Sequence, residues 1–199
     1  MQCNRALIEL AAVNHRIKID LRYATDKNFL GFPVYSKAVC YVHYEVAEAL
    51  NLVQQELETM SLGLKVFDAY RPLSVQQIMW DKIQDERYVA NPAKHKGRHT
   101  RGTAVDLTLV DPFNRELEMP TAFDDFTEKA HSDYPHASQE ALQNRALLQH
   151  VMRKYGFQTF PTEWWHFDIQ GWLDDIKFPP LDISFEELLK QVESGGVSM

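Results

Sequence analysis

The segment from residue 103 to residue 110 has the clearest strand pattern in the chain, and a carboxylate stands at its centre. The set of side chains that contains Asp106 alternates with an apolar set, so the two sets face opposite sides of a strand. The apolar set is Val105, Leu107 and Leu109. A lone buried charge is costly, so this carboxylate needs a cationic partner or a metal ion. Any fold of this chain must therefore bring such a partner to Asp106.

Apolar residues at helical spacing predict four helices. Ser74 is the expected N-cap of the second helix, and Ser184 with Glu187 forms a capping box for the last one. Valine and leucine side chains on one face of the first helix are expected to lie in the core. The predicted helices span about 38–60, 74–85, 138–155 and a short segment after residue 184.

The remaining segments are predicted to form strands and loops around those helices. Two unpatterned stretches, 86–98 and 111–137, are predicted loops, and a loop as long as the second is usually functional. Helices packed on a small antiparallel sheet make an α+β fold, and we expect one domain over residues 1–199. The predicted strands are 64–70, 103–110, 157–160 and 165–169, with the last two as a hairpin.

Charge and hydropathy exclude some classes of protein. The formal net charge is -7, which argues against a nucleic-acid partner because such proteins carry a basic face. No run of about 20 apolar residues is present, so no membrane span is expected. The apolar stretch 6–13 is short and broken by Glu9, which makes a poor signal peptide and favours a cytoplasmic location. Cys3 and Cys40 fit no zinc-knuckle or disulfide spacing, and we expect free thiols.

Candidate partners of Asp106 stand at two places in the sequence. His99 lies seven residues upstream, a distance of roughly 23 Å at about 3.3 Å per extended residue, so the chain must fold back, with Gly102 as the pivot. His166 supplies a third nitrogen or oxygen donor. Three protein ligands and one water are typical of a catalytic zinc site, although no HExxH motif is present. The alternative is a salt bridge from Asp106 to Arg98 or Arg101.

Two further residues fit hydrolytic chemistry at such a metal. Glu163 is a candidate general base toward a zinc-bound water. Residues three apart face opposite sides of a strand, so Glu163 can share a site with His166 only if it still lies in the preceding loop. Arg71 follows the strand 64–70, where a guanidinium could stabilise an oxyanion, and the alternative is an ordinary surface charge.

Several conspicuous side chains are expected to be structural. We expect Trp164 and Trp165 to be walls of a core or pocket. The remaining histidines are expected to be surface or hydrogen-bonded residues rather than ligands. They are His15, His43, His95, His131, His136 and His150.

Together these motifs resemble a known family, the D-alanyl-D-alanine dipeptidases, which are zinc enzymes typified by the vancomycin-resistance dipeptidase. The resemblance runs from about Ile19 to about Phe167, with matching order and gaps. It rests on the segments His99-Thr100-Arg101-Gly102-Thr103-Ala104-Val105-Asp106-Leu107, Glu163-Trp164-Trp165-His166, Asp68-Ala69-Tyr70-Arg71-Pro72 and Tyr23-Ala24-Thr25.

The resemblance implies roles for the metal site and the reaction. One zinc ion per chain would be held by His99, Asp106 and His166. Glu163 would act as base toward the water and then as acid toward the leaving amine, while Arg71 would stabilise the tetrahedral intermediate. The implied reaction is hydrolysis of D-alanyl-D-alanine to two D-alanines, with zinc as the cofactor and a small dipeptide as the only implied partner.

The resemblance also implies a substrate site, with one departure from the family pattern. Tyr23 and Asp124 would contact the free ammonium of a dipeptide, which selects dipeptides over longer chains. Members often have a serine two residues before the first zinc histidine, and this chain has Gly97 there. The alternatives are a D,D- or L,D-carboxypeptidase acting on peptidoglycan stem peptides, and a non-catalytic metal-binding or ligand-binding module.

Overall fold

The structure, a computed structural model, describes residues 7–94 and 97–195. A five-stranded sheet runs through its centre, and each strand is antiparallel to its neighbours except the edge strand β2, which is parallel to β4. In spatial order its strands are β2 (Lys18–Ile19), β4 (Gly63–Asp68), β5 (Ala104–Val110), β7 (Glu163–Ile169) and β6 (Phe157–Phe160). A second, two-stranded sheet pairs β1 (Leu7–Glu9) with β3 (Tyr41–His43).

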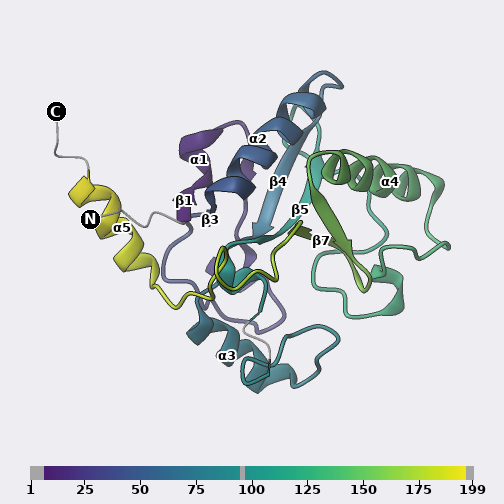
Figure 1. The fold of residues 1–199 in the computed structure, drawn as a ribbon. Coiled ribbons are helices and arrows are strands. Elements are labelled where there is room, and N and C mark those ends of the chain that lie inside the picture. The colour runs from purple at the N-terminus through teal and green to yellow at the C-terminus, as the bar shows by residue number, and fades with distance from the viewer. Residues whose placement is uncertain (1–6, 95–96, 196–199) are drawn as a thin grey trace.

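Helices pack on this sheet, which confirms the α+β fold (Figure 1). Figure 1 shows α2 and α4 side by side against the sheet, while α3 lies beyond one end of it. The helices are α1 (Leu10–Val13), α2 (Tyr44–Glu58), α3 (Leu73–Ile83), α4 (Gln139–Lys154) and α5 (Phe185–Gly195). Short 3-10 turns span Arg22–Ala24, His99–Arg101 and Glu128–Ala130.

The first long helix is confirmed, but it begins later than predicted. Residues 41–43 form β3, because they pair with β1 in a separate small sheet. His43 has extended backbone angles, and its Nδ1 accepts from the backbone N–H of Glu45, so it caps α2 rather than lying within it. The predicted apolar stripe is fully buried: Val46, Leu50, Val53 and Leu57.

Of the two predicted helix caps, the Ser184–Glu187 box is confirmed and Ser74 is wrong, while Ser138 caps α4 without having been predicted to do so. The backbone N–H of Ala141 donates to the hydroxyl of Ser138 at the start of α4, and the Ser184–Glu187 capping box is present before α5. Ser74 does not cap α3, because the helix already begins at Leu73 after Pro72. Both the backbone N–H and the hydroxyl of Ser74 donate instead to Asp182, at 2.9 Å each.

The predicted strands and loops are present with small changes at their ends. The hairpin of β6 and β7 is confirmed, although β7 begins at Glu163 rather than at residue 165. Loop 111–137 contains one short 3-10 turn and an isolated bridge from Val110 to Glu116. Within it, Phe123 packs against the rings of Phe67 and Trp165, which anchors the loop over the sheet.

The remaining expectations concern the two cysteines, His95 and membrane spans. Cys40 is a free, buried thiol, and burial raises its pKa well above the ordinary value. Cys3 and His95 lie outside the described residues. Among the described residues, no helix has the length and apolar character needed to cross a membrane.

Candidate active site

A tight turn brings His99 back toward β5. The 3-10 turn His99–Arg101 is followed by Gly102 at φ 67°, a left-handed conformation that glycine adopts without steric cost. A Cβ atom at this position would lie 2.9 Å from the backbone nitrogen of His43. The predicted pivot is therefore present, and its close packing leaves room only for glycine.

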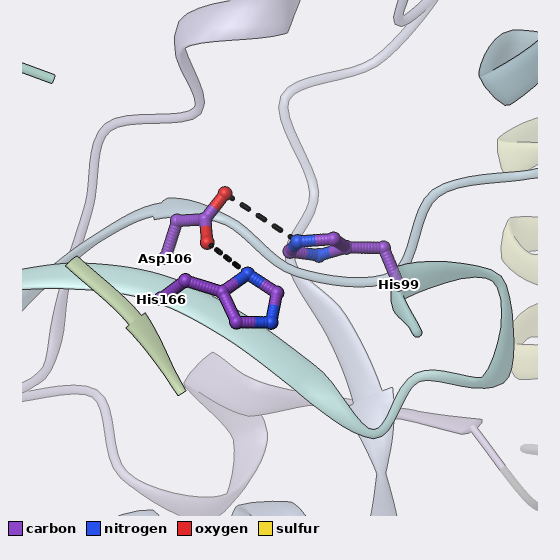
Figure 2. A group of neighbouring side chains, drawn as sticks. All are labelled: His99, Asp106 and His166. Carbon is purple, nitrogen blue, oxygen red and sulfur yellow. Dashed lines mark hydrogen bonds and ion pairs between the residues drawn. The ribbon is translucent and has the colours of Figure 1, made fainter. Parts of the chain in front are cut away.

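Three side chains then meet on one face of the sheet. Asp106 on β5 and His166 on β7 are directly paired residues, so their side chains point to the same face. One possible ligand atom from each of them and one from His99 lie within 4.8 Å of one another, and all three residues are buried. Figure 2 shows the Asp106 carboxylate between the two rings, 3.0 Å from His166 Nδ1 and 3.5 Å from His99 Nε2.

The outer nitrogen of each histidine ring has its own partner. His99 Nδ1 donates to the carbonyl of Ala69 at 2.8 Å, because a carbonyl oxygen can only accept. His166 Nε2 lies 3.0 Å from Asp168 Oδ1. A neutral His99 ring therefore carries its proton on Nδ1, and its Nε2 faces Asp106. His166 has Asp106 at Nδ1 and Asp168 at Nε2. Burial alone would lower the pKa of its imidazole, but the two carboxylates raise that pKa to about 10.

This donor set fits zinc. Two imidazole nitrogens and a carboxylate are ordinary zinc ligands, and three protein donors leave a fourth tetrahedral position open. Burial works against ionisation of Asp106, but His99 and His166 hold the pKa of its carboxyl well below the usual range. The salt-bridge alternative is wrong, because Arg98 pairs with Asp168 and Arg101 pairs with Asp175.

Glu163 reaches the same place from the start of β7, not from a loop as predicted. Thr159 on β6 pairs with Phe167, whereas the next residue, Phe160, pairs with Glu163. This shift in register breaks the simple alternation of side chains along β7. Glu163 Oε2 consequently lies 3.6 Å from His166 Nδ1. Its carboxyl is buried, and desolvation raises its pKa above the ordinary value.

Arg71 is buried in the site, so its interpretation as a surface charge is wrong. Its Nε and Nη2 donate to Asp68 Oδ2 at 3.1 and 2.6 Å, and Nη1 donates to Gln76 at 2.8 Å. Burial alone would lower the pKa of the guanidinium, but the Asp68 carboxylate beside it raises that pKa well above the ordinary value. These contacts use three of the five N–H donors of an arginine.

Tyr23 and Asp124 meet although they are 101 residues apart, since the tyrosine hydroxyl donates to Asp124 Oδ1 at 2.9 Å. Asp124 Oδ2 is buried and has no hydrogen-bond partner among the described residues. Burial raises the pKa of the Asp124 carboxyl to about 7, even though the Tyr23 hydrogen bond lowers it. The residue as a whole is only half-buried, and it is the carboxylate oxygen that points inward.

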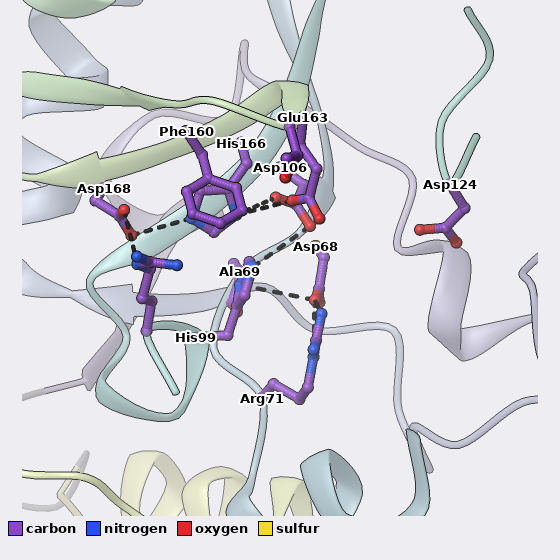
Figure 3. A network of polar contacts seen from close by, with 12 residues as sticks. Asp68, Ala69, Arg71, His99, Asp106, Asp124, Phe160, Glu163, His166 and Asp168 are labelled. Carbon is purple, nitrogen blue, oxygen red and sulfur yellow. Dashed lines mark hydrogen bonds and ion pairs between the residues drawn. The ribbon is translucent and has the colours of Figure 1, made fainter. Parts of the chain in front are cut away.

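All seven predicted residues line one pocket of about 70 Å³. Figure 3 shows the Asp124 carboxylate directed toward the group that contains Asp106 and Glu163. Trp165 forms part of the wall, as predicted, and Gly97 lies at the rim with φ 74°. The seven residues are Tyr23, Arg71, His99, Asp106, Asp124, Glu163 and His166.

The sequence left some residues of the site unassigned. Asp168 stands two residues after His166 on the same strand, so a period of two could have revealed it. Asp68 belongs to the motif around Arg71, but only the structure shows that it anchors the guanidinium. Gln76 carries no sequence signal. The described histidines predicted to lie elsewhere do not line the pocket: His15, His43, His131, His136 and His150.

The sequence comparisons with known proteins agree on one family. The profile of the D-ala-D-ala dipeptidase family, Peptidase_M15, matches residues 4–182. The D-alanyl-D-alanine dipeptidase of Escherichia coli K12 is 35% identical over 163 residues, which cover 82% of this chain and 84% of the relative. The Enterococcus faecium enzyme of the same name is 32% identical over 178 residues, covering 79% and 88%. A solved structure of VanYB in complex with D-alanine-D-alanine has 16% identity and a TM-score of 0.47, covering 78% of this chain and 86% of that one.

Proposed function

This chain belongs to the D-ala-D-ala dipeptidase family, and from that premise we propose how its residues carry out the reaction. The protein is a zinc metallopeptidase that hydrolyses D-alanyl-D-alanine to two D-alanines. One observation carries this conclusion: a buried set of three metal donors shares a small pocket with a carboxylate base and an unpaired carboxylate oxygen.

Zinc would be held by His99, Asp106 and His166. Their mutual distances support this assignment, and so do the hydrogen bonds that occupy the outer ring nitrogens. When bound, zinc polarises the scissile carbonyl and lowers the pKa of a water molecule to about 7.

Glu163 is the general base and then the general acid. Its carboxylate takes a proton from the attacking water while the new C–O bond forms, and returns that proton to the nitrogen as the C–N bond breaks. The buried position supports this role, because desolvation stabilises the protonated form between the two steps.

Arg71 stabilises the oxyanion that develops on the substrate carbonyl. Two of its N–H donors remain after the contacts to Asp68 and Gln76, and those contacts hold the guanidinium rigidly. A donor that is already oriented costs no reorganisation when charge develops, which is why such groups are effective.

Tyr23 and Asp124 bind the free ammonium of the dipeptide. The unpaired Oδ2 of Asp124 supports this assignment, because an ammonium satisfies a buried carboxylate oxygen. A longer peptide would present a neutral amide there and leave the carboxylate without a charged partner. The pocket volume of about 70 Å³ also favours a small substrate, since sites for drug-sized ligands measure about 300–1,000 Å³.

The test is an assay of the purified protein on free D,D-, L,L- and mixed alanyl dipeptides, with zinc and with a chelator. We expect zinc-dependent cleavage of D-alanyl-D-alanine and none of the L,L isomer. Inactivity on every dipeptide, with zinc bound in stoichiometric amount, would contradict the proposal.

One observation favours the second candidate, a D,D- or L,D-carboxypeptidase. A larger groove of about 860 Å³ adjoins the pocket and shares Gly97, Arg98 and Phe160 with its wall, so a longer peptide has a surface to lie on. Comparison of D-alanyl-D-alanine with an N-acetylated tripeptide decides between the two, because preference for the blocked tripeptide would exclude the dipeptidase. A non-catalytic module is disfavoured because the base Glu163 is present.

The location of the protein and its domain boundaries complete the proposal. A cytoplasmic location is supported by the free thiol of Cys40, which suits a reducing compartment. Cell fractionation with an antibody to the chain tests it. A single domain over residues 1–199 predicts one cooperative unfolding transition.

A further inference from the structure

Arg98 lines both the pocket and the adjoining groove, and two aromatic rings contact its guanidinium. Its Cζ atom is 4.3 Å from the centroid of the Phe160 ring and 4.7 Å from that of Trp172. The side chain is 31% exposed, so it is a partly desolvated cation, and cation–π attraction to each ring is larger than at a fully exposed site. Its position in the wall is therefore well defined.

The same guanidinium is linked to a proposed zinc ligand through one carboxylate. Arg98 Nε lies 3.0 Å from Asp168 Oδ2, and Asp168 Oδ1 lies 3.0 Å from His166 Nε2. The Arg98 Nε–H makes no hydrogen bond within the described part of the chain, so its link to Asp168 is an ion pair. Asp168 is buried, and these two cationic or donor groups face its two oxygens.

A second contact connects the same three groups. The Phe160 ring that packs on Arg98 also packs on the imidazole of His166, with 5.2 Å between ring centroids. The His166 ring and its outer nitrogen thus each contact a residue that also contacts Arg98. Among the described residues, the arginines that line the active-site pocket are Arg71, Arg87 and Arg98. Arg71 pairs with Asp68 and Arg87 pairs with Asp85, so only Arg98 pairs with Asp168.

We propose that Arg98 is a positioning residue for the metal centre: it fixes Asp168 and Phe160, and through them orients His166 so that Nδ1 faces the ion. This inference rests on the proposed set of zinc ligands. Removal of a group that orients a ligating histidine typically weakens metal binding by about 10- to 100-fold. Lysine is a poor replacement, because its ammonium lacks the plane that stacks between two rings.

The experiment measures zinc affinity by competition with a chromophoric chelator, independently of hydrolysis. We expect R98M to bind zinc about 10- to 100-fold more weakly than the wild type, and R98K to fall between them. The matched control is R115M, because Arg115 also pairs with an aspartate, Asp111, and packs on an aromatic ring, Phe113, but lies outside the pocket. R115M should bind zinc like the wild type.

A double-mutant cycle with D168N separates positioning from general destabilisation. If Arg98 acts through Asp168, the R98M substitution should lower zinc affinity less in the D168N protein than it does in the wild type. The absorption bands of the cobalt-substituted protein should shift in R98M and D168N but not in R115M. If R98M does not fold, R98K and D168N carry the same comparison.

The contradicting results are distinct from a failure of the proposed function. Zinc affinity of R98M within twofold of the wild type, or fully additive losses in the double variant, would overturn the role of Arg98 alone. A wild-type protein that binds no zinc at the chelator concentrations used would overturn the ligand assignment, and this inference with it.

Discussion

Asp106 and Asp124 are two carboxylates of one pocket in opposite electrostatic situations. His99 and His166 lower the pKa of Asp106, so it is ionised and ready to bind a cation. Asp124 has only the Tyr23 hydroxyl, and burial raises its pKa to about 7. Histidines of the protein itself keep Asp106 ionised, whereas we expect Asp124 to gain its charged partner only when substrate binds.

The raised pKa of Asp124 predicts a pH-dependent substrate affinity. Below about pH 7 the carboxyl is protonated in the free enzyme and cannot pair with an ammonium, so KM should fall as pH rises through 7. Asp124→Asn should raise KM at pH 8 by about 10-fold or more, because a charge-assisted contact is lost. The change in KM around pH 7 should disappear in this variant. The measurement is KM against pH for both proteins at saturating zinc. A wild-type KM that is flat from pH 6 to 8 would contradict the role of Asp124.

The same shift also predicts the effect of pH on stability. The native state favours the protonated carboxyl, so the stability that this group contributes is present at low pH and is lost as pH rises from about 4 to about 7. Asp124→Asn should therefore stabilise the substrate-free protein at pH 8 and have little effect at pH 4. Urea unfolding at both pH values measures this difference, and an equal effect at the two values would argue against it.

Glu163 gives the sharpest test of the reaction chemistry. Glu163→Ala should retain zinc but lose kcat by about 10²- to 10⁴-fold, because the proton acceptor is gone. The measurements are kcat and bound zinc per chain. Glu140→Gln, an exposed acid in the first turn of α4, is the control and should leave both unchanged. Near-normal turnover without the Glu163 carboxyl would remove it from the mechanism.

Gly97 is constrained by its backbone, not by space. Its φ is 74°, and an added Cβ atom would lie 3.4 Å from Thr100 Cγ2, close to ordinary contact. Gly97→Ser, which introduces the residue often found at this position in the family, should therefore cost about 1–2 kcal/mol of unfolding free energy. Gly97→Asn should cost less, because asparagine tolerates the left-handed region. Chemical denaturation of the wild type, Gly97→Ser and Gly97→Asn measures these costs. Equal free energies of unfolding would show that the backbone at residue 97 is not strained by a side chain.

At the scale of single elements, sequence periodicity found the helices and strands but not their irregular ends. Alternation along β7 placed Glu163 and His166 on opposite faces, and only the shift in pairing with β6 brings them together. Such a shift depends on two strands at once, so a pattern along one segment does not reveal it. In the same way, the pattern along the sequence predicts β3 as part of the helix, because its partner strand β1 lies far upstream.

The buried stripe of α2 allows a matched comparison within one helix. Leu50 is fully buried, whereas Leu52, two residues later, is 46% exposed. Leu50→Ala should lower the free energy of unfolding by about 2–5 kcal/mol, since it leaves a cavity between α2 and the sheet. Leu52→Ala should change it by less than about 0.5 kcal/mol. Urea unfolding measures both, and similar losses would show that α2 does not pack as described.

At the scale of the whole molecule, the α+β class and the meeting of His99, Asp106 and His166 could be predicted, because strong local signals point to them. Asp106 stood out as an acid in an apolar strand, and Gly102 marked the turn that returns His99. The parallel edge strand β2 and the anchors Asp68 and Asp168 could not be predicted, because they depend on which strands become neighbours. Spatial order within a sheet is set by packing among distant segments, which a single sequence does not display.

Zinc should stabilise the molecule as a whole, because its proposed ligands come from three separate segments: the turn at His99, β5 and β7. Binding to the native state alone adds about 2.7 kcal/mol at a free zinc concentration 100 times Kd. A chelator should lower Tm, and added zinc should restore it, as calorimetry would measure. Unchanged Tm after verified zinc removal would show that the site is not coupled to folding.

The pairing of Asp106 with His166 across β5 and β7 also bears on when the enzyme becomes active during its synthesis. A ribosome releases the N-terminal part of a chain first, and contacts between distant segments form only once both have emerged. The three metal donors therefore cannot come together until β7 has left the ribosome, which happens after β4 and β5 have been synthesised. We therefore expect no hydrolytic activity from a nascent chain that has not yet exposed β7.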